Sequence, residues 1–243
     1  MMNNASNIFA GLVLAVGLAV AGYFVSDGLV HLRGGERAVS VRGLSERDVK
    51  ADMAIWTIQY TVTDNDLSLA QAALSEQGTK IEAFLKKQGL PANEVRVQRV
   101  DVTDLLAQQY RPDNIQNGRY ILTKTYLVRT ENVALVDTMF RNVGDLIADG
   151  VILSSPNGGQ MQAPSYIFTG LNDVKPDMIA EATKNAREAA QKFAEDSGAR
   201  VGEIKAAYQG LFQINARDDD NTMESGVIDK RVRVVTTVEY YLE

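Results

Sequence analysis

One uninterrupted apolar stretch, Ile8 to Val25 (IFAGLVLAVGLAVAGYFV), limits most strongly how this chain can fold, because it contains no charged residue. As a helix, a stretch of this length rises about 27 Å, close to the roughly 30 Å hydrocarbon core of a bilayer. The residues after it show the alternating and amphipathic patterns of a domain surrounded by water. We therefore expect a membrane anchor at residues 8–25, preceded by a short tail at residues 1–7 and followed by one extramembrane domain.

A signal peptide is the alternative for this stretch. Signal peptides begin with basic residues, and residues 1–7 (MMNNASN) contain no Lys or Arg. The small-residue triplet Ala19-Val20-Ala21 resembles a cleavage site, but it lies inside the apolar run. An uncleaved single-pass anchor is favoured, and residues 8–25 are then the part of the chain that contacts the lipid bilayer.

Small residues recur along the anchor at a spacing of four, as Gly11, Ala15 and Ala19. Such a row lets two membrane helices approach closely, so these residues form the predicted oligomerisation face of the anchor. The competing interpretation is that Gly and Ala are simply common in membrane helices.

The side of the membrane is only weakly indicated by charge. Arg33 and Arg37 follow the anchor and no basic residue precedes it, which by itself favours a cytoplasmic domain. Long domains, however, cross the membrane largely regardless of charge. Residues 26–37 have the character of a juxtamembrane stalk, and residues 38–243 are expected to form the folded domain.

Composition excludes several kinds of function. The net charge is −6 and no Lys/Arg cluster is present, which argues against a nucleic-acid partner. The chain has no cysteine, and His31, its only histidine, lies in the stalk. Zinc sites and catalytic triads built on Cys or His are therefore not expected in the domain. We predict no cofactor, no metal, no catalytic residue and no enzymatic activity.

Periodicity predicts the secondary structure of the domain. Strands are expected where apolar and polar residues alternate, at 38–43, 53–63, 94–106, 120–130, 151–154, 165–169, 201–209 and 227–242. Helices are expected where apolar residues recur at helical spacing, at 66–88, 132–149 and 176–197. In the strand 94–106 the alternation changes phase, which predicts a β-bulge or turn near Gln98–Arg99.

The expected fold class is therefore α+β, an N-terminal transmembrane helix followed by an antiparallel or mixed sheet with about three helices. A faint internal similarity accompanies it. Phe84-x4-Gly89-x4-Glu94-Val95 matches Phe193-x4-Gly198-x4-Glu203-Ile204, each at a helix that ends on Gly and continues into a strand. Two similar strand–helix–strand halves would explain this match.

The acidic stretch near the C-terminus is the best candidate for a cation site. It contains Asp218-Asp219-Asp220 with Glu224 and Asp229, and calcium prefers such oxygen-rich groups. In an EF-hand register that starts at Asp218, however, Met223 stands where Gly is required. A solvated acidic loop is the favoured interpretation.

The pattern resembles the SIMPL-domain proteins of the bacterial envelope. The resemblance is carried by VSVRGLSERDVKADMAIWTIQYTV, by YLVRTENVALVDTMFRNVGDLIADGV, by AEATKNAREAAQKFAEDSGARVGEI and by the final strand. Where Pro-Asp-Ala is usual, this chain has Asp52-Met53-Ala54. The resemblance implies an α+β domain exported across the inner membrane, a link to envelope and oxidative stress, and, in some members, homo-oligomeric rings with a central channel. It implies no catalytic residues.

Two functional hypotheses follow. The first is a non-enzymatic, membrane-anchored envelope protein that associates with itself into a homo-oligomer of ring or channel type, held in the inner membrane with its C-terminal domain in the periplasm. The second is a monomeric periplasmic module that binds a ligand or calcium. A deep apolar pocket or a metal-dependent rise in melting temperature would favour the second.

Overall fold

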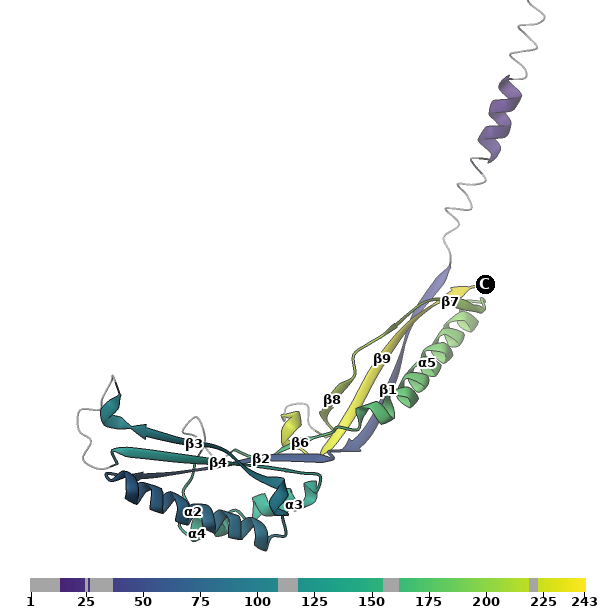
Figure 1. Cartoon of the computed structure of the whole chain (residues 1–243). Coiled ribbons are helices and arrows are strands. Elements are labelled where there is room, and N and C mark those ends of the chain that lie inside the picture. The colour runs from purple at the N-terminus through teal and green to yellow at the C-terminus, as the bar shows by residue number, and fades with distance from the viewer. Residues whose placement is uncertain (1–13, 25, 27–36, 109–117, 155–161, 219–222) are drawn as a thin grey trace, which may run out of the picture. The chain divides into compact units, whose positions relative to one another are not determined.

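A computed structural model of the chain describes residues 14–24, 26, 37–108, 118–154, 162–218 and 223–243 (Figure 1). These residues form an α+β fold with antiparallel strand pairs and the helices labelled α2 to α5. The predicted fold class is confirmed at this level.

The described part of the predicted anchor is a helix at residues 14–24, and its side chains are exposed. Leu14 and Phe24, for example, are 68% and 69% exposed. Residues 8–13 and 25 lie outside the described residues. In the part of the chain that the structure describes, no helix combines the length and the apolar character needed to cross a bilayer.

The domain consists of two compact units, each built from separate stretches of sequence. Unit 1 contains the described residues up to Gly43 together with Ala182–Gln209 and Thr236–Glu243, and unit 2 contains Leu44–Glu181 and Gly210–Val235. Three long elements therefore contribute residues to both units: β1 (Ala38–Lys50), α5 (Leu171–Asp196) and β9 (Asp229–Leu242).

One sheet, with the strand order β3-β4-β2-β5, forms the centre of unit 2, and β6 also pairs with β2. Its strands are β2 (Met53–Asp64), β3 (Val95–Asp104), β4 (Tyr120–Thr130), β5 (Leu153–Ser154) and β6 (Ser165–Ile167). Its helices are α2 (Leu67–Lys87), α3 (Val133–Arg141) and α4 (Gly144–Ala148). Strands β3 and β4 pair antiparallel, as do β4 and β2.

The core of unit 2 lies between the helices and one face of the sheet. Trp56, Ile58 and Tyr60 of β2 are fully buried there, and Trp56 makes an edge-on contact with the Phe140 ring. The apolar residues that recur at helical spacing along α2 form a buried stripe, as the predicted helix at 66–88 requires: Ala70, Leu74, Ile81, Phe84 and Leu85. Burial of large side chains of this kind contributes about 1.5–3 kcal/mol each.

The second sheet has the order β1-β9-β7, and β8 (Gln213–Ala216) also pairs with β9; β7 spans Val201–Gln209. In unit 1, Val39, Val238 and Tyr240 of this sheet pack with Ala186 and Ala190 of α5. The alanine stripe lets the helix lie very close to the strand, since a Cβ on Gly43 would stand 1.8 Å from the Ala182 carbonyl oxygen. Ala189 and Phe193 of the same helix are exposed.

Several predicted boundaries differ from the structure. Helix α5 begins at Leu171 rather than at Pro176, so Pro176 lies inside the helix and not at its first position. The single helix predicted at 132–149 is two, α3 and α4, which meet at Asn142 and Val143, just before Gly144. Strand β1 is longer than predicted, and the short strand β8 was missed, since four residues carry too little periodicity to detect.

Candidate functional site

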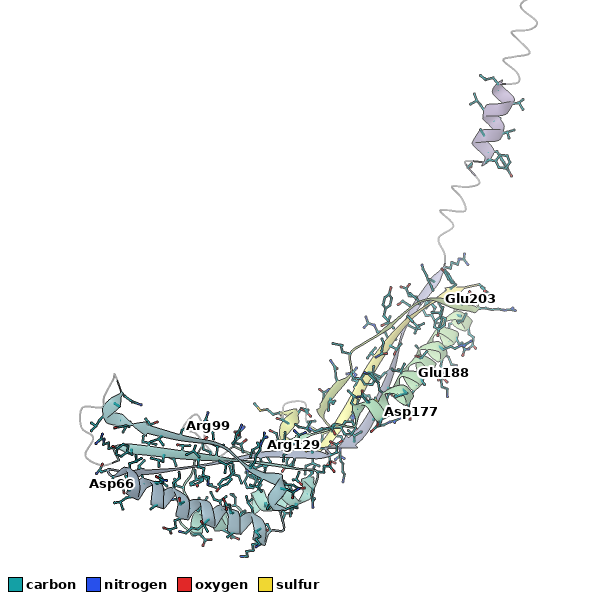
Figure 2. All side chains as sticks on the ribbon, in the orientation of Figure 1. Asp66, Arg99, Arg129, Asp177, Glu188 and Glu203 are labelled. Atoms are coloured by element: carbon teal, nitrogen blue, oxygen red, sulfur yellow. The ribbon has the colours of Figure 1, made fainter. Side chains whose placement is uncertain are left out.

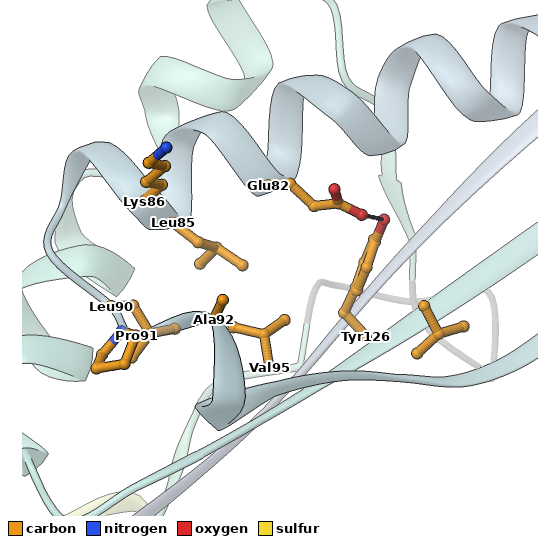
Figure 3. A pocket seen from close by; sticks show the side chains of 9 residues that line it. Glu82, Leu85, Lys86, Leu90, Pro91, Ala92, Val95 and Tyr126 are labelled. Carbon is orange, nitrogen blue, oxygen red and sulfur yellow. Dashed lines mark hydrogen bonds between the residues drawn. The ribbon is translucent and has the colours of Figure 1, made fainter.

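An apolar pocket of about 580 Å³ lies in unit 2 between the end of α2 and the start of β3 (Figure 3). Its lining residues are Glu82, Leu85, Lys86, Leu90, Pro91, Ala92, Val95, Val97 and Tyr126. The chain turns after α2 at Gly89, where φ is +92°. Residues other than glycine rarely adopt this conformation, which explains the glycine at this position. The turn returns the chain along the other wall of the pocket.

The pocket is open because α2 covers β2 and β4 but not the outermost strand, β3. Val97, Val100 and Val102 of β3 lie on the same face of the sheet as Tyr126 and the buried residues of β4, according to the strand register. They are nevertheless 48%, 51% and 56% exposed. The result is an apolar row along a strand whose outer edge has no partner in the described residues.

A polar cluster beside the pocket contributes Glu82 and Tyr126 to its wall. The Tyr126 hydroxyl donates a 2.5 Å hydrogen bond to Glu82 Oε1, and the Tyr126 ring stacks against Tyr60 with 6.2 Å between centroids. The Tyr60 hydroxyl donates to the Leu74 carbonyl oxygen at 2.8 Å. The ammonium of Lys124 lies 4.7 Å from the centre of the Tyr126 ring, a cation–π distance.

These tyrosines keep their protons well into the alkaline range. Burial raises the pKa of Tyr60 to about 12. Burial, and after it the hydrogen bond to Glu82, also raises the pKa of Tyr126 above its ordinary value. The two phenols therefore remain hydrogen-bond donors, to Glu82 and to the Leu74 carbonyl oxygen, because a phenol whose pKa is raised in this way does not act as a base near neutral pH.

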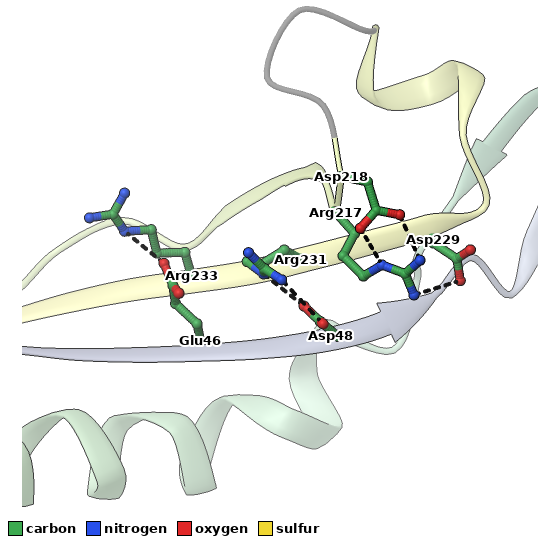
Figure 4. A network of polar contacts seen from close by, with 7 residues as sticks. All are labelled: Glu46, Asp48, Arg217, Asp218, Asp229, Arg231 and Arg233. Atoms are coloured by element: carbon green, nitrogen blue, oxygen red, sulfur yellow. Dashed lines mark hydrogen bonds and ion pairs between the residues drawn. The ribbon is translucent and has the colours of Figure 1, made fainter.

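The acidic residues proposed as a calcium site are engaged by cations where the structure describes them (Figure 4). Arg217 donates to Asp218 at 2.8 and 2.6 Å and lies 3.6 Å from Asp229. Glu224 pairs with Lys230, whose side chain is fully buried. Asp219 and Asp220 lie outside the described residues.

Two further ion pairs lie beside this group, between β1 and β9. Arg231 donates to both carboxylate oxygens of Asp48, at 2.7 and 3.2 Å, and Arg233 lies 3.5 Å from Glu46. The hydrogen bond from Arg231 holds the pKa of Asp48 below its ordinary value. Within the described ranges, no group of three or more His, Asp or Glu side chains is arranged to hold a metal ion. The charged residues of Figure 4 thus form a ladder of ion pairs across neighbouring strands.

Comparison with known proteins gives one decisive match. The family model described as SIMPL, protein of unknown function (DUF541), matches residues 39–240, nearly the whole domain. The chain belongs to the SIMPL family. The resemblance inferred from the sequence is confirmed.

Other comparisons add little to the SIMPL assignment. No curated protein matches the chain. A solved structure of an amidase of the hydantoinase/carbamoylase family from Burkholderia phymatum shares 13% identity, with a TM-score of 0.26. The similarity covers 60% of this chain and 36% of that one, and at this TM-score it supports no functional argument.

The site residues predicted for this SIMPL protein were those of the anchor. Ala15 and Ala19 lie in the exposed helix at residues 14–24, whereas Gly11 lies outside the described residues, as does His31. No finding tests whether Gly11, Ala15 and Ala19 form an oligomerisation face, so this remains a prediction.

The pocket and its tyrosines were not predicted from the sequence. One signal was available: Gly78 stands in the middle of the apolar stripe of α2, where a glycine weakens a helix and usually has a packing reason. A Cβ at Gly78 would lie 2.7 Å from the Tyr60 hydroxyl and 3.1 Å from that of Tyr126. Gly78 therefore makes room for the two hydroxyls beneath the helix.

Proposed function

We propose that this SIMPL protein is a non-enzymatic, membrane-anchored protein of the bacterial envelope that associates with itself into a homo-oligomer. The observation that carries the proposal is the apolar row Val97, Val100 and Val102 on the unpaired edge of β3. The family resemblance supports the envelope location and a role linked to envelope or oxidative stress.

Membrane attachment is supported by the N-terminal segment. Residues 8–25 contain no charge, and the large apolar side chains of the helix at 14–24 are exposed rather than packed against protein. Lipid would cover such side chains. In this proposal the chain crosses the inner membrane once, with residues 1–7 in the cytoplasm and the C-terminal domain in the periplasm.

Self-association is supported by the chemistry of an edge strand. An unpaired strand presents free N–H and C=O groups, and proteins usually protect such an edge with charges. The charged residues of β3, such as Arg96 and Arg99, alternate with valines, and the valines on its helix-facing side are exposed. Pairing with another chain would therefore bury apolar surface as well as satisfy backbone groups. Tethering every copy to one membrane raises the effective concentration of the domains and makes a modest interface sufficient.

The ring form of the assembly is the finer part of the proposal. A ring requires a contact between two different surfaces of successive copies, whereas contact of one surface with itself gives a dimer. A second apolar edge is available, since β7 also ends its sheet in the described residues and Ile204 and Tyr208 are 54% and 65% exposed. Pairing of β3 in one copy with β7 in the next would give such a contact.

We also propose that the two strand–helix–strand arrangements arose from one repeated unit, with one copy inserted within the other. In both arrangements the strand that follows the helix, β3 after α2 and β7 after α5, lies at an edge of its sheet. The next strand in the chain lies beside it in the middle, which gives the orders β3-β4-β2 and β7-β9-β1. The matched glycines, Gly89 and Gly198, both have positive φ, at 92° and 70°.

Light scattering on the detergent-extracted full-length chain tests the assembly, beside a chain that begins at Arg37. We expect a homo-oligomer for the full-length chain and a return to monomer in Val102→Lys, which places a charge on the exposed edge. Leu69→Lys is the matched control, because Leu69 is also exposed (60%) but lies on α2. If the two unsubstituted chains both run as monomers, the assembly proposal fails. Protease protection in spheroplasts tests the side of the membrane.

A monomeric ligand-binding module is the second candidate, and the apolar pocket favours it. A cavity of about 580 Å³ has the size of a small-molecule site, and apolar walls with a few polar groups are typical of such sites. A naphthalene-class fluorescent probe should then bind once per monomer, and Ala92→Trp should block it. The calcium form of this candidate has less support, because Asp218, Glu224 and Asp229 already pair with cations.

A further inference from the structure

A second hollow lies on the face of the unit 2 sheet opposite α2. It has a volume of about 500 Å³ and is lined by Thr57, Gln59, Gln98, Arg99 and Thr125. Side chains alternate between the faces of a strand, so Gln59 and Thr125 point away from the buried neighbours Tyr60 and Tyr126. All five lining side chains are polar, in contrast to the apolar pocket on the helix side.

A β-bulge brings two of these side chains to the hollow. Val97 pairs with Tyr126 and Arg99 pairs with Thr125, so Gln98 is the extra residue of β3. The bulge predicted near Gln98–Arg99 is thus confirmed. Bulges redirect side chains and are frequent beside binding sites. Here the extra residue places Gln98 and Arg99 next to Thr125.

Two residues that line the hollow each hold a buried polar atom that has no hydrogen-bond partner among the described residues. Gln59 and Thr125, directly opposite each other on β2 and β4, are 7% and 4% exposed, and both Gln59 Oε1 and Thr125 Oγ1 are unpartnered. Nearby hydroxyls on the same face are satisfied, since Thr61 Oγ1 lies 3.0 Å from Thr123 Oγ1 and 2.9 Å from Ser154 Oγ. An unsatisfied buried polar atom is costly, and its presence calls for an explanation such as a ligand.

We propose that this hollow is a binding site for a neutral saccharide. Gln59 Oε1 calls for a hydrogen-bond donor, whereas the Gln59 NH2 group, which the soft terminal torsion can turn to the same place, calls for an acceptor. A fully ionised phosphate or carboxylate can only accept. Sugar hydroxyls both donate and accept, as do the Thr hydroxyls and Gln amides around them.

Charge and position agree with this ligand class. Arg99 lies 2.5 Å from Asp101, so the cation is neutralised by its own neighbour and does not attract an anion strongly. The hollow also lies on a face of the sheet, where side chains and not backbone groups would contact a ligand. Extended peptides, by contrast, bind along sheet edges through backbone hydrogen bonds.

Saturation-transfer NMR on the full-length chain tests the site, with maltotriose and chitotriose as probes. The chain is kept in an amine-oxide detergent, because a maltoside detergent carries a sugar headgroup that would compete. Trialanine is run beside the saccharides in the same way, and inorganic phosphate, which has no carbon-bound proton to observe, is followed by the line width of its phosphorus-31 resonance. We expect saturable binding of at least one saccharide and none of phosphate or trialanine.

Two near-isosteric variants remove the proposed contacts. Thr125→Val and Gln59→Met should each weaken saccharide binding by about tenfold or more, the usual effect of losing a hydrogen bond and leaving its partner unpaired. Thr125→Val should not lower the melting temperature, because it deletes a hydroxyl that has no partner in the part of the chain that the structure describes. Thr123→Val is the matched control: it breaks a hydrogen bond within the protein, so it should lower the melting temperature and leave binding unchanged.

Three outcomes would overturn the proposal: no binding of either saccharide, binding of phosphate or trialanine alone, or saccharide binding that Thr125→Val and Gln59→Met leave unchanged. The assembly test is independent of this one, since Val102 does not line the hollow.

Discussion

The helix–sheet layers of the two units share an order of elements but are held together in opposite ways. In unit 1, the glycine is on the strand: Gly43 allows the backbone of α5 to approach, and alanines fill the narrow gap. In unit 2, the glycine is on the helix: Gly78 leaves room for the hydroxyls of Tyr60 and Tyr126, which hold α2 at side-chain distance from the sheet.

This difference shows that one topology can be packed by backbone contact or by large side chains, with different consequences. A close backbone contact leaves no group that can move aside, so it tolerates almost no substitution. A layer of large side chains can adjust, and it also leaves space. The apolar pocket beside Tyr126 lies in the unit whose helix is held by large side chains.

Gly43→Ala should have the largest effect. The added Cβ would stand 1.8 Å from the Ala182 carbonyl oxygen, and neither backbone can yield without separating α5 from the strand. We expect a loss of about 3 kcal/mol or more in the free energy of unfolding of unit 1. Far-UV circular dichroism in urea should show this loss, while fluorescence of Trp56, the only tryptophan, should report a nearly unchanged unit 2.

Gly144→Ala is the control for this comparison, because no atom lies within 4 Å of the position of its Cβ and its φ is not positive. It should leave stability unchanged or slightly raised. A Gly43→Ala chain as stable as the unsubstituted one would contradict the close-contact description of unit 1.

Alkaline pH should weaken unit 2 next most strongly. The pKa of Tyr60 is raised to about 12, so above pH 10 the unfolded chain loses this proton while the folded chain keeps it. Stability is therefore full below pH 10 and falls as the pH rises towards 12, by roughly 1.4 kcal/mol for each unit of pKa difference. Urea titrations followed by Trp56 fluorescence measure the fall, and Tyr60→Phe should reduce its slope. A slope unaffected by that substitution would assign the effect to other groups.

Gly78→Ala should cost less than Gly43→Ala, about 1 to 2 kcal/mol, although Ala favours helices. The reason is that the new Cβ meets the Tyr60 hydroxyl, the end of a side chain, at 2.7 Å. Adding Tyr60→Phe removes that hydroxyl and should restore much of the loss. Urea denaturation of the two single variants and the double variant measures this coupling, and strict additivity would refute it.

Arg231→Gln should have the smallest effect. It removes the two hydrogen bonds to Asp48, but both side chains are largely in solvent, where ion pairs contribute little. The midpoint of urea unfolding should fall slightly at low salt, and the difference from the unsubstituted chain should vanish in 1 M sodium chloride, where charges are screened within about 3 Å. A large, salt-independent loss would mean that the ladder in Figure 4 does more than pair charges.

Local features of the fold were readable from the sequence because they depend on neighbours in the chain. The alternation in β2, the stripe of α2 and the phase change at Gln98–Arg99 follow from strand and helix geometry alone. Asn132, the first residue of the predicted helix 132–149, is the N-cap of α3. The N-cap of α2 is Asp66 (Figure 2), whose carboxylate accepts from the backbone N–H groups of Ser68 and Leu69.

The sequence by itself determined the family, the fold class, most of the strands and helices and the bulge, since each follows from residue type and short-range periodicity. Only the tertiary structure decided which strand each helix leaves uncovered, why Gly43 and Gly78 are glycines, and that Gln59 and Thr125 stand unpartnered beside one hollow. These depend on distances between residues far apart in the chain. No local pattern encodes such distances.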